Sequence, residues 1–182
     1  MMVEFGIEAT PFSHDKLDTW RENFVGVQAL HKPTNFLVFG AVDDIWVTPQ
    51  GELIVVDYKA TAKASEVSID SDWQIMYKRQ MEVYQWLLRQ NDFEVSDTGY
   101  FVYANGRLDL DGFYNKVEFR TKIIPYTGNA AWIEKTLPKM KQCLEGDMPQ
   151  PGKAVMGGDC DYCTYAKKRT ELTLKHLQNS KK

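Results

Sequence analysis

The sequence predicts an α/β (α+β) fold in which helices flank a central mixed β-sheet. Two observations favour this class: helical and strand patterns alternate along the chain, and an aromatic fraction of 13% suffices for a packed core. The hydrophobic fraction of 43% and the charged fraction of 26% are typical of globular proteins, which excludes disordered and fibrous classes. Because 182 residues suit one domain and no linker interrupts them, we expect a single domain over residues 1–182.

The first half of the chain begins with an expected helix and two expected strands. A Ser-His-Asp cap followed by apolar residues at helical spacing predicts the helix over residues 13–25. Residues 36–47 are rich in branched and aromatic side chains and predict one long strand. Residues 52–59 predict the returning strand, because a Pro-Gln-Gly turn separates them from the first.

The rest of the chain is expected to contain three helices and two strands. Either Asp70 or Asp72 caps a helix that ends near Asn91. The remaining expected elements are strands at residues 99–103 and 116–124 and helices at residues 129–144 and 164–178.

Composition also bears on location. No apolar run approaches the roughly 18 residues that a membrane span needs, and residues 1–5 lack the features of a secretory signal. The three cysteines are too few, and odd in number, for a disulfide framework, which favours a reducing compartment. We therefore expect a cytoplasmic protein with no membrane partner.

Charge is distributed unevenly along the chain. The formal net charge of -3 at first speaks against a nucleic-acid partner. However, residues 1–72 carry 5 Lys or Arg and 12 Asp or Glu, whereas residues 73–182 carry 17 and 13. This asymmetry is either chance variation on a solvated surface or a gathering of acids for a cation and of bases for a polyanion.

A turn at residues 49–51 sets the register of the two strands around it. Its proline suits the first central position of a type I turn, and its glycine tolerates the left-handed conformation that closes a three-residue loop. Thr48 then faces Glu52, and counting back from this pair places Asp43 directly opposite Asp57. Residues directly opposite each other share one face of the hairpin.

Lys59 points to the same face as the two aspartates, while Asp44 and Tyr58 point to the other. Two carboxylates this close raise one pKa unless a cation lies between them. A hard cation such as Mg²⁺ takes oxygen ligands from one or two carboxylates and keeps waters for a phosphate substrate. The alternative is a surface Asp-Lys-Asp cluster on an ordinary hairpin, and a two-residue turn would place the aspartates on opposite faces.

Three motifs carry a family resemblance. They are G-x-x-D at Gly40–Asp43, D-Y-K at Asp57–Lys59 and Q-x-x-x-Y at Gln80–Tyr84. In this order they resemble the PD-(D/E)xK nuclease superfamily and, within it, the RecB-type branch of CRISPR-associated exonucleases and recombination-helicase nuclease domains. The resemblance covers residues 36–170 and implies a restriction-endonuclease-like core, to which residues 146–182 add a cysteine-containing basic tail.

The resemblance implies a metal-dependent site. Asp43 resembles the first metal-binding carboxylate and Asp57 the second, with the backbone carbonyl of Tyr58 as a further ligand. Lys59 resembles the catalytic lysine, which orients the attacking water and stabilises charge on the phosphate. The cation would be Mg²⁺ or Mn²⁺, which polarises the phosphodiester and lowers the pKa of a bound water.

Two further sets of residues follow from the resemblance. Gln80 and Tyr84 lie one helical turn apart on a face that in the family borders the active site and DNA, although Tyr84 can equally be a core residue. The family also adds a His or Glu ligand from a helix before the first strand. His14 is the first candidate for this ligand, and Glu22 and His31 are weaker candidates. A lone histidine is more often structural.

Cys160 and Cys163 form a C-x2-C pair that resembles the iron–sulfur tail of RecB-type nucleases. Such a cluster needs four thiolates, but Arg169 occupies the third tail position and no cysteine precedes Cys143. An iron–sulfur cluster is therefore not expected from this chain alone, while a two-thiolate remnant or a shared Zn²⁺ remains open. The absent upstream cysteine also suggests a chain without the family's usual N-terminal segment.

The C-terminal helix is basic and is either a DNA-contacting helix or an ordinary solvated one. The basic residues of this C-terminal tail are Lys167, Lys168, Arg169, Lys175, His176, Lys181 and Lys182.

The leading hypothesis is a Mg²⁺- or Mn²⁺-dependent DNA nuclease that processes DNA ends, with single-stranded DNA or ends as its partner rather than a specific duplex. The RecB-type resemblance also suggests DNA repair within a larger recombination or repair assembly. The alternative is a catalytically inactive nucleic-acid-binding or protein-interaction module on the same fold, since the His or Glu ligand and the cluster are absent. A third reading, an α/β protein that acts on something else, requires a different hairpin register.

Overall fold

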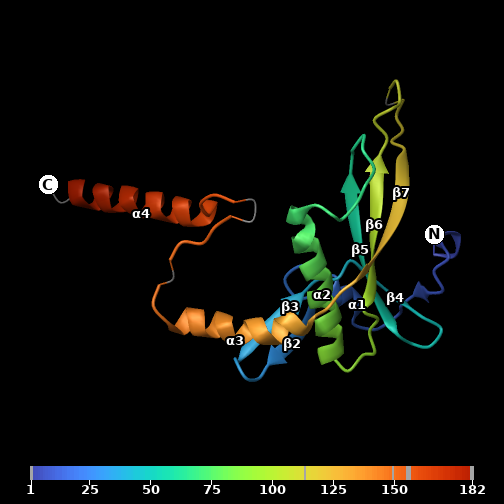
Figure 1. Cartoon of the computed structure of the whole chain (residues 1–182), viewed down its shortest axis with the longest axis horizontal. Coiled ribbons are helices and arrows are strands. Elements are labelled where there is room, and N and C mark those ends of the chain that lie inside the picture. Colours follow the sequence, from blue (N-terminus) through green and yellow to red (C-terminus); the bar gives the residue numbers. More distant parts are fainter. Residues whose placement is uncertain (1, 113, 149, 155–156, 181–182) are drawn as a thin grey trace. The chain divides into compact units, whose positions relative to one another are not determined.

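A mixed five-stranded sheet forms the centre of the N-terminal part of the chain (Figure 1). Its strands, in spatial order, are β1 (Thr10–Pro11), β4 (Asp44–Val47), β5 (Leu53–Thr61), β6 (Thr98–Gly106) and β7 (Phe119–Thr127). β5 and β6 are parallel, and the other neighbours are antiparallel. A separate two-stranded sheet pairs β2 (Val27–His31) with β3 (Phe36–Gly40). Together with the helices, this confirms the predicted α/β class.

The computed structural model describes residues 2–112, 114–148, 150–154 and 157–180. Its helices are α1 (Leu17–Trp20), α2 (Ile75–Gln90), α3 (Ala131–Glu145) and α4 (Asp161–Asn179), with 3₁₀ turns η1 (Val3–Phe5) and η2 (Asp72–Gln74). The chain divides into two compact units, Met1–Met140 and Lys141–Lys182. The first unit contains both sheets, and the second contains α4. The predicted single domain with a tail from residue 146 stays a prediction.

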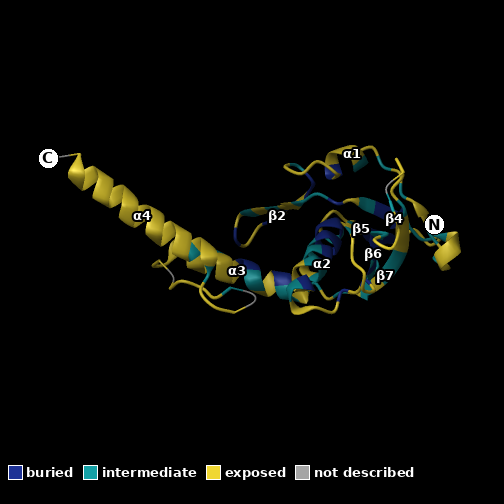
Figure 2. Ribbon diagram, turned by 90° about the horizontal axis from the view of Figure 1, so that it is seen from above, coloured by how far each residue is buried: buried dark blue, intermediate teal, exposed yellow. Residues whose placement is uncertain are grey.

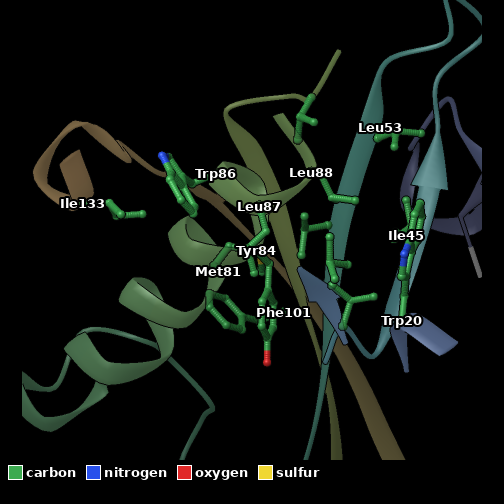
Figure 3. Packing of buried hydrophobic residues seen from close by; sticks show 14 of the residues in the cluster. Trp20, Ile45, Leu53, Met81, Tyr84, Trp86, Leu87, Leu88, Phe101 and Ile133 are labelled. Carbon is green, nitrogen blue, oxygen red and sulfur yellow. The ribbon is translucent and has the colours of Figure 1, made fainter. Parts of the chain in front are cut away.

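Side chains of β5 alternate between two cores. Leu53 and Val55 belong to the larger core, in which α2 packs on the sheet and Phe101 of β6 is fully buried (Figure 3). Ile54 and Val56 belong to a smaller core on the opposite face, against residues of the N-terminal segment. Each such side chain contributes about 1.5–3 kcal/mol when fully buried, so both faces of β5 stabilise its position. The burial colours of Figure 2 show α2 as a largely buried helix beside the sheet.

The 3₁₀ turn η2, which leads directly into α2, begins at a capping box with Ser71 as its N-cap rather than at either predicted aspartate. The Ser71 backbone N–H donates to Gln74 Oε1 at 2.9 Å, and the Ser71 side chain accepts from the backbone of Gln74. The prediction of Asp70 or Asp72 as the cap is wrong, because serine with a glutamine three residues later satisfies two orphan N–H groups at once.

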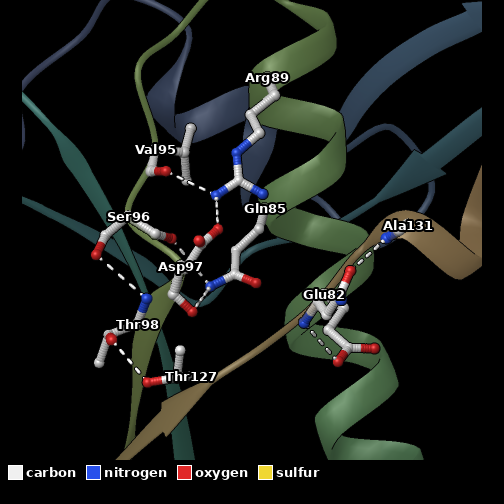
Figure 4. Close-up of polar contacts among 10 residues, drawn as sticks. Glu82, Gln85, Arg89, Val95, Ser96, Asp97, Thr98, Thr127 and Ala131 are labelled. Atoms are coloured by element: carbon white, nitrogen blue, oxygen red, sulfur yellow. Dashed lines mark hydrogen bonds and ion pairs between the residues drawn. The ribbon is translucent and has the colours of Figure 1, made fainter.

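Buried polar residues fasten α2 to neighbouring segments. Gln85 Nε2 donates to the carbonyls of Ser96 and Asp97 just before β6, at 3.1 and 3.0 Å (Figure 4). Glu82 accepts hydrogen bonds from the Tyr126 hydroxyl at 2.7 Å and the Asn129 N–H at 3.0 Å. Because these partners lie just before β6, in β7 and just before α3, the helix cannot slide along the sheet without breaking several bonds.

The strand predicted over residues 36–47 is wrong as a single element. It is two strands in different sheets, because β3 pairs with β2 while β4 pairs with β5. Between them the chain bends inward: Val42 is buried and its N–H donates to the Trp20 carbonyl at 3.0 Å. Strand propensity continues through this link, so the sequence pattern did not reveal the break.

The helix predicted over residues 13–25 is also wrong in length, because α1 ends at Trp20. Phe24, which completed the apolar stripe, is 92% exposed. Gly26 then has a φ of +62° and lies so close to Gly40 that a Cβ would approach the Gly40 carbonyl to 2.4 Å. This contact leads the chain into β2, a strand that was not predicted, and the tertiary pairing overrides local helix propensity.

Substituting Gly40 by alanine should destabilise the fold, because its Cβ would lie 2.6 Å from Cε1 of the Tyr84 ring. We expect a loss of about 1–3 kcal/mol in the free energy of unfolding, measured by urea denaturation. Gly152→Ala is the control, since nothing lies within 4 Å of that position. The cost should be smaller in a Tyr84→Leu background, and an equal cost in both backgrounds would refute the proposed contact.

Candidate active site

The β4–β5 hairpin has the predicted three-residue loop. The Thr48 N–H donates to the Glu52 carbonyl at 2.9 Å, and Gly51 has a φ of +88°, which a glycine adopts without strain. In the ladder, Asp44 pairs with Val56. The predicted register is thereby confirmed over the paired residues. Asp43 lies one residue beyond the ladder, and counting on from the Asp44–Val56 pair places it opposite Asp57.

Asp43 comes just before β4 begins and turns its carboxylate toward β5. Its Oδ2 accepts the backbone N–H of Tyr58 at 2.8 Å, which fixes the side chain beside the Asp57–Lys59 segment. Its backbone carbonyl accepts a hydrogen bond from Arg21 Nε at 3.2 Å. Both side chain and backbone of Asp43 are therefore held from outside its own strand.

Asp57 continues the face of β5 that packs under α2, and it is 2% exposed. Its Oδ2 is buried, contacts the Lys59 ammonium and makes no well-oriented hydrogen bond to any described residue. Burial raises the pKa of the Asp57 carboxyl above its ordinary value of 3.8; the Lys59 ammonium opposes the shift and the Asp43 carboxylate adds to it. A buried carboxylate beside a second carboxylate suits a hard divalent cation, which takes oxygen ligands.

Lys59 completes the predicted trio on this face. Its ammonium contacts Asp57 and lies 4.6 Å from the centroid of the Tyr77 ring. In the parallel ladder it pairs with Tyr103 of β6. The lysine is thus held between a carboxylate and an aromatic wall, with only 19% of its side chain exposed.

The opposite face of the hairpin carries a second polar cluster. The Tyr58 hydroxyl donates to Asp44 Oδ2 at 2.8 Å, and an Arg21 guanidinium nitrogen donates to Asp44 Oδ1 at 2.7 Å. Burial and the Asp44 carboxylate raise the pKa of Tyr58 to about 12, so the phenol stays a donor. The shared face predicted for Asp44 and Tyr58 is confirmed. Arg21 was missed, because its link to the hairpin spans more than twenty residues of sequence.

The Q-x-x-x-Y pair is joined by a hydrogen bond: Gln80 Nε2 donates to the Tyr84 hydroxyl at 2.8 Å. The Tyr84 ring belongs to the larger core, as the alternative reading expected. Burial raises the pKa of Tyr84, and the Asp43 and Asp57 carboxylates raise it further despite the bond from Gln80. Any contact of the Gln80–Tyr84 pair with DNA stays a prediction.

His14 lies in an aromatic cluster rather than among the carboxylates. Its ring stacks on Trp20 with a centroid distance of 4.7 Å, and its Nδ1 accepts the Lys16 N–H at 3.1 Å. His31 is buried and bonds to Thr34 and Glu134. Among the described residues, no three or more His, Cys, Asp or Glu side chains form a group that could hold a metal ion.

The second unit contains the two tail cysteines. Cys160 is the N-cap of α4, and both it and Cys163 border a surface hollow of about 480 Å³ together with Lys167 and Lys168. The backbone and side chain of Cys163 lower the pKa of the Cys160 thiol. Arg169 also lies on α4, where none of the described residues is buried. Metal binding at the cysteines and DNA binding at the basic residues stay predictions, and Lys181 and Lys182 lie outside the described residues.

Asp57→Asn should raise the stability of the metal-free protein at neutral pH. The pKa of Asp57 is higher in the folded than in the unfolded protein, so protonation of its carboxyl stabilises the fold. This stabilisation is lost as the pH rises through the folded-state pKa. An asparagine cannot ionise, so its advantage should be near zero at acidic pH and should grow toward pH 7. Urea denaturation in chelator at several pH values measures the difference.

Asp44→Asn is the matched control on the other face of the hairpin. It weakens charge-assisted bonds from Arg21 and Tyr58, and we expect a loss of about 1–3 kcal/mol. An Asp57→Asn variant destabilised as much as this control at neutral pH would contradict the burial account.

Comparison with known proteins is consistent with this geometry. A family model described as the PD-(D/E)XK nuclease superfamily matches residues 3–167, which is most of the chain. No curated protein and no solved structure matches the chain. Within the described residues, no helix is both long and apolar enough to cross a membrane. The chain belongs to the PD-(D/E)XK nuclease superfamily.

Proposed function

We propose that this protein is a Mg²⁺- or Mn²⁺-dependent phosphodiesterase that hydrolyses DNA and trims DNA ends as an exonuclease. Membership of the superfamily indicates a metal-dependent nuclease. One observation carries the proposal: the buried Asp57 carboxylate lies beside the Asp43 carboxylate and in contact with the Lys59 ammonium. Folding alone does not favour this arrangement, because burial raises the pKa of Asp57 even with the Lys59 ammonium beside it.

In the proposed mechanism each residue of the trio has a separate role. The Asp43 and Asp57 carboxylates and the Tyr58 carbonyl would hold the cation, which supplies charge to polarise the phosphodiester and lower the pKa of water. Lys59 orients the attacking water and stabilises negative charge on the phosphate. Its fixed position matters, because a charge that is already oriented needs no reorganisation during the reaction.

The hydrogen bond from the Tyr58 backbone N–H to the Asp43 carboxylate gives this site its rigidity. It joins the first carboxylate to the backbone between the second carboxylate and the lysine. The Arg21 bond to the Asp43 carbonyl holds the same residue from the opposite side. The two carboxylates are therefore positioned before any cation binds, which is the preorganisation that metal sites require.

A second candidate function is a binding module that retains the fold without catalysis. It is favoured by the lack, among the described residues, of a third acidic, His or Cys side chain grouped with Asp43 and Asp57. In that case the protein would bind DNA or a protein without hydrolysing a phosphodiester. A preference for single-stranded DNA or ends, a role in a recombination or repair assembly, and a cytoplasmic location are further predictions from the sequence.

Cleavage assays separate the two candidates. Single-stranded and duplex oligonucleotides labelled at either end are incubated with Mg²⁺, with Mn²⁺ or with chelator. We expect metal-dependent shortening from an end, and a loss of at least about 100-fold in Lys59→Met and Asp57→Asn. Lys32→Met, at an exposed position outside the trio, is the control. Equal rates in all variants would refute the site, and salt-sensitive binding without cleavage by the native chain would favour the binding module.

A further inference from the structure

Two aromatic rings stand beside the lysine of the proposed active site. Tyr77, in the first turn of α2, lies under the Lys59 ammonium at 4.6 Å. Trp73, in η2, meets Tyr77 edge to face, with a centroid distance of 5.4 Å and an interplanar angle of 77°. Both rings are half-buried, so each keeps an accessible surface.

Trp73, the ring farther from Lys59 in this pair (the outer ring), does not take part in core packing. Tyr77 packs against the edge of the larger core, whereas Trp73 belongs to neither core. A tryptophan that is only partly buried and lies outside both cores leaves some apolar ring surface in water, which is unfavourable unless something covers it. Trp73 therefore has surface available for a ligand.

The position of the pair is nevertheless fixed. Between the two rings in sequence, Gln74 is 2% exposed, closes the capping box with Ser71 and donates to the Ser68 carbonyl at 2.7 Å. A rigid aromatic surface loses little conformational entropy on binding, which suits it to stacking.

A second lysine accompanies the outer ring. Lys63 Nζ lies 5.8 Å from the Trp73 centroid. The backbone of Lys63 is held at both its N–H and its carbonyl by the Asn105 side chain, at 2.8 and 3.0 Å. Each ring is thus paired with one ammonium group, which is the combination of stacking faces and phosphate-attracting charges that single-stranded nucleic acid binds.

We propose that Trp73 and Tyr77 form a stacking site for an unpaired base of the DNA strand whose phosphate lies at Lys59. Lys63 would attract the next phosphate along that strand. Because bases in a duplex already stack on each other, this site selects single-stranded DNA over duplex. The inference rests on the proposed nuclease function and deepens it by assigning residues that determine the substrate.

The test measures binding of a fluorescent single strand and of a hairpin duplex to the full chain in chelator, by anisotropy. Trp73→Leu should weaken single-strand binding about tenfold and leave duplex binding unchanged, while Trp73→Phe retains most of the affinity. Phe24→Leu is the matched control, since it alters a 92% exposed aromatic ring with none of these contacts. Equal single-strand affinity in Trp73→Leu and Phe24→Leu, or equal losses for single strand and duplex, would overturn the proposal.

A DNA-side experiment keeps the proposal testable if Trp73→Leu fails to fold. An abasic site is moved along the single strand, and binding to the unaltered protein should fall about tenfold at one or two adjacent positions. A uniform response, or no single-strand binding at all, would overturn the stacking site. Cleavage in Mg²⁺ is measured in parallel: a stacking effect without cleavage refutes only the nuclease function, and cleavage without a stacking effect refutes only this inference.

Discussion

The antiparallel register of β4 and β5 is the constraint on which the candidate site depends. Gly51 closes a three-residue loop, and the pairing that follows puts Asp57 and Lys59 on the face that α2 covers. A shift of one residue would send both side chains to the face where Tyr58 bonds Asp44. The turn therefore decides whether the carboxylates and the lysine meet at all.

Helix α2 covers the face that this register creates and shields Asp57 from water. Its core contacts and the bonds of Glu82 and Gln85 hold it over the sheet, so Asp57 is buried even though burial raises its pKa. The fold tolerates this unfavourable carboxylate because both faces of β5 contribute apolar burial. In the proposed function, the same desolvation strengthens the attraction of the site for a cation.

Local patterns predicted the parts of the structure that local physics determines. The Pro-Gln-Gly turn determined the hairpin register, and the alternation along β5 followed from strand geometry. The sequence did not reveal the second sheet or the break at Ala41–Asp43, because those depend on β2 pairing with β3. Arg21 and Tyr77 were missed for the same reason: each reaches the hairpin through the tertiary fold, and neither belongs to a local motif.

Direct measurement of Mn²⁺ binding tests the central claim that Asp43 and Asp57 share a cation. Free Mn²⁺ is followed by electron paramagnetic resonance during titration of the native chain and of Asp43→Asn, Asp57→Asn and Asp44→Asn. The account predicts one site in the native chain, retained in Asp44→Asn and weakened about tenfold or more in the other two variants. Equal affinity in all four proteins, or no binding by the native chain, would contradict it.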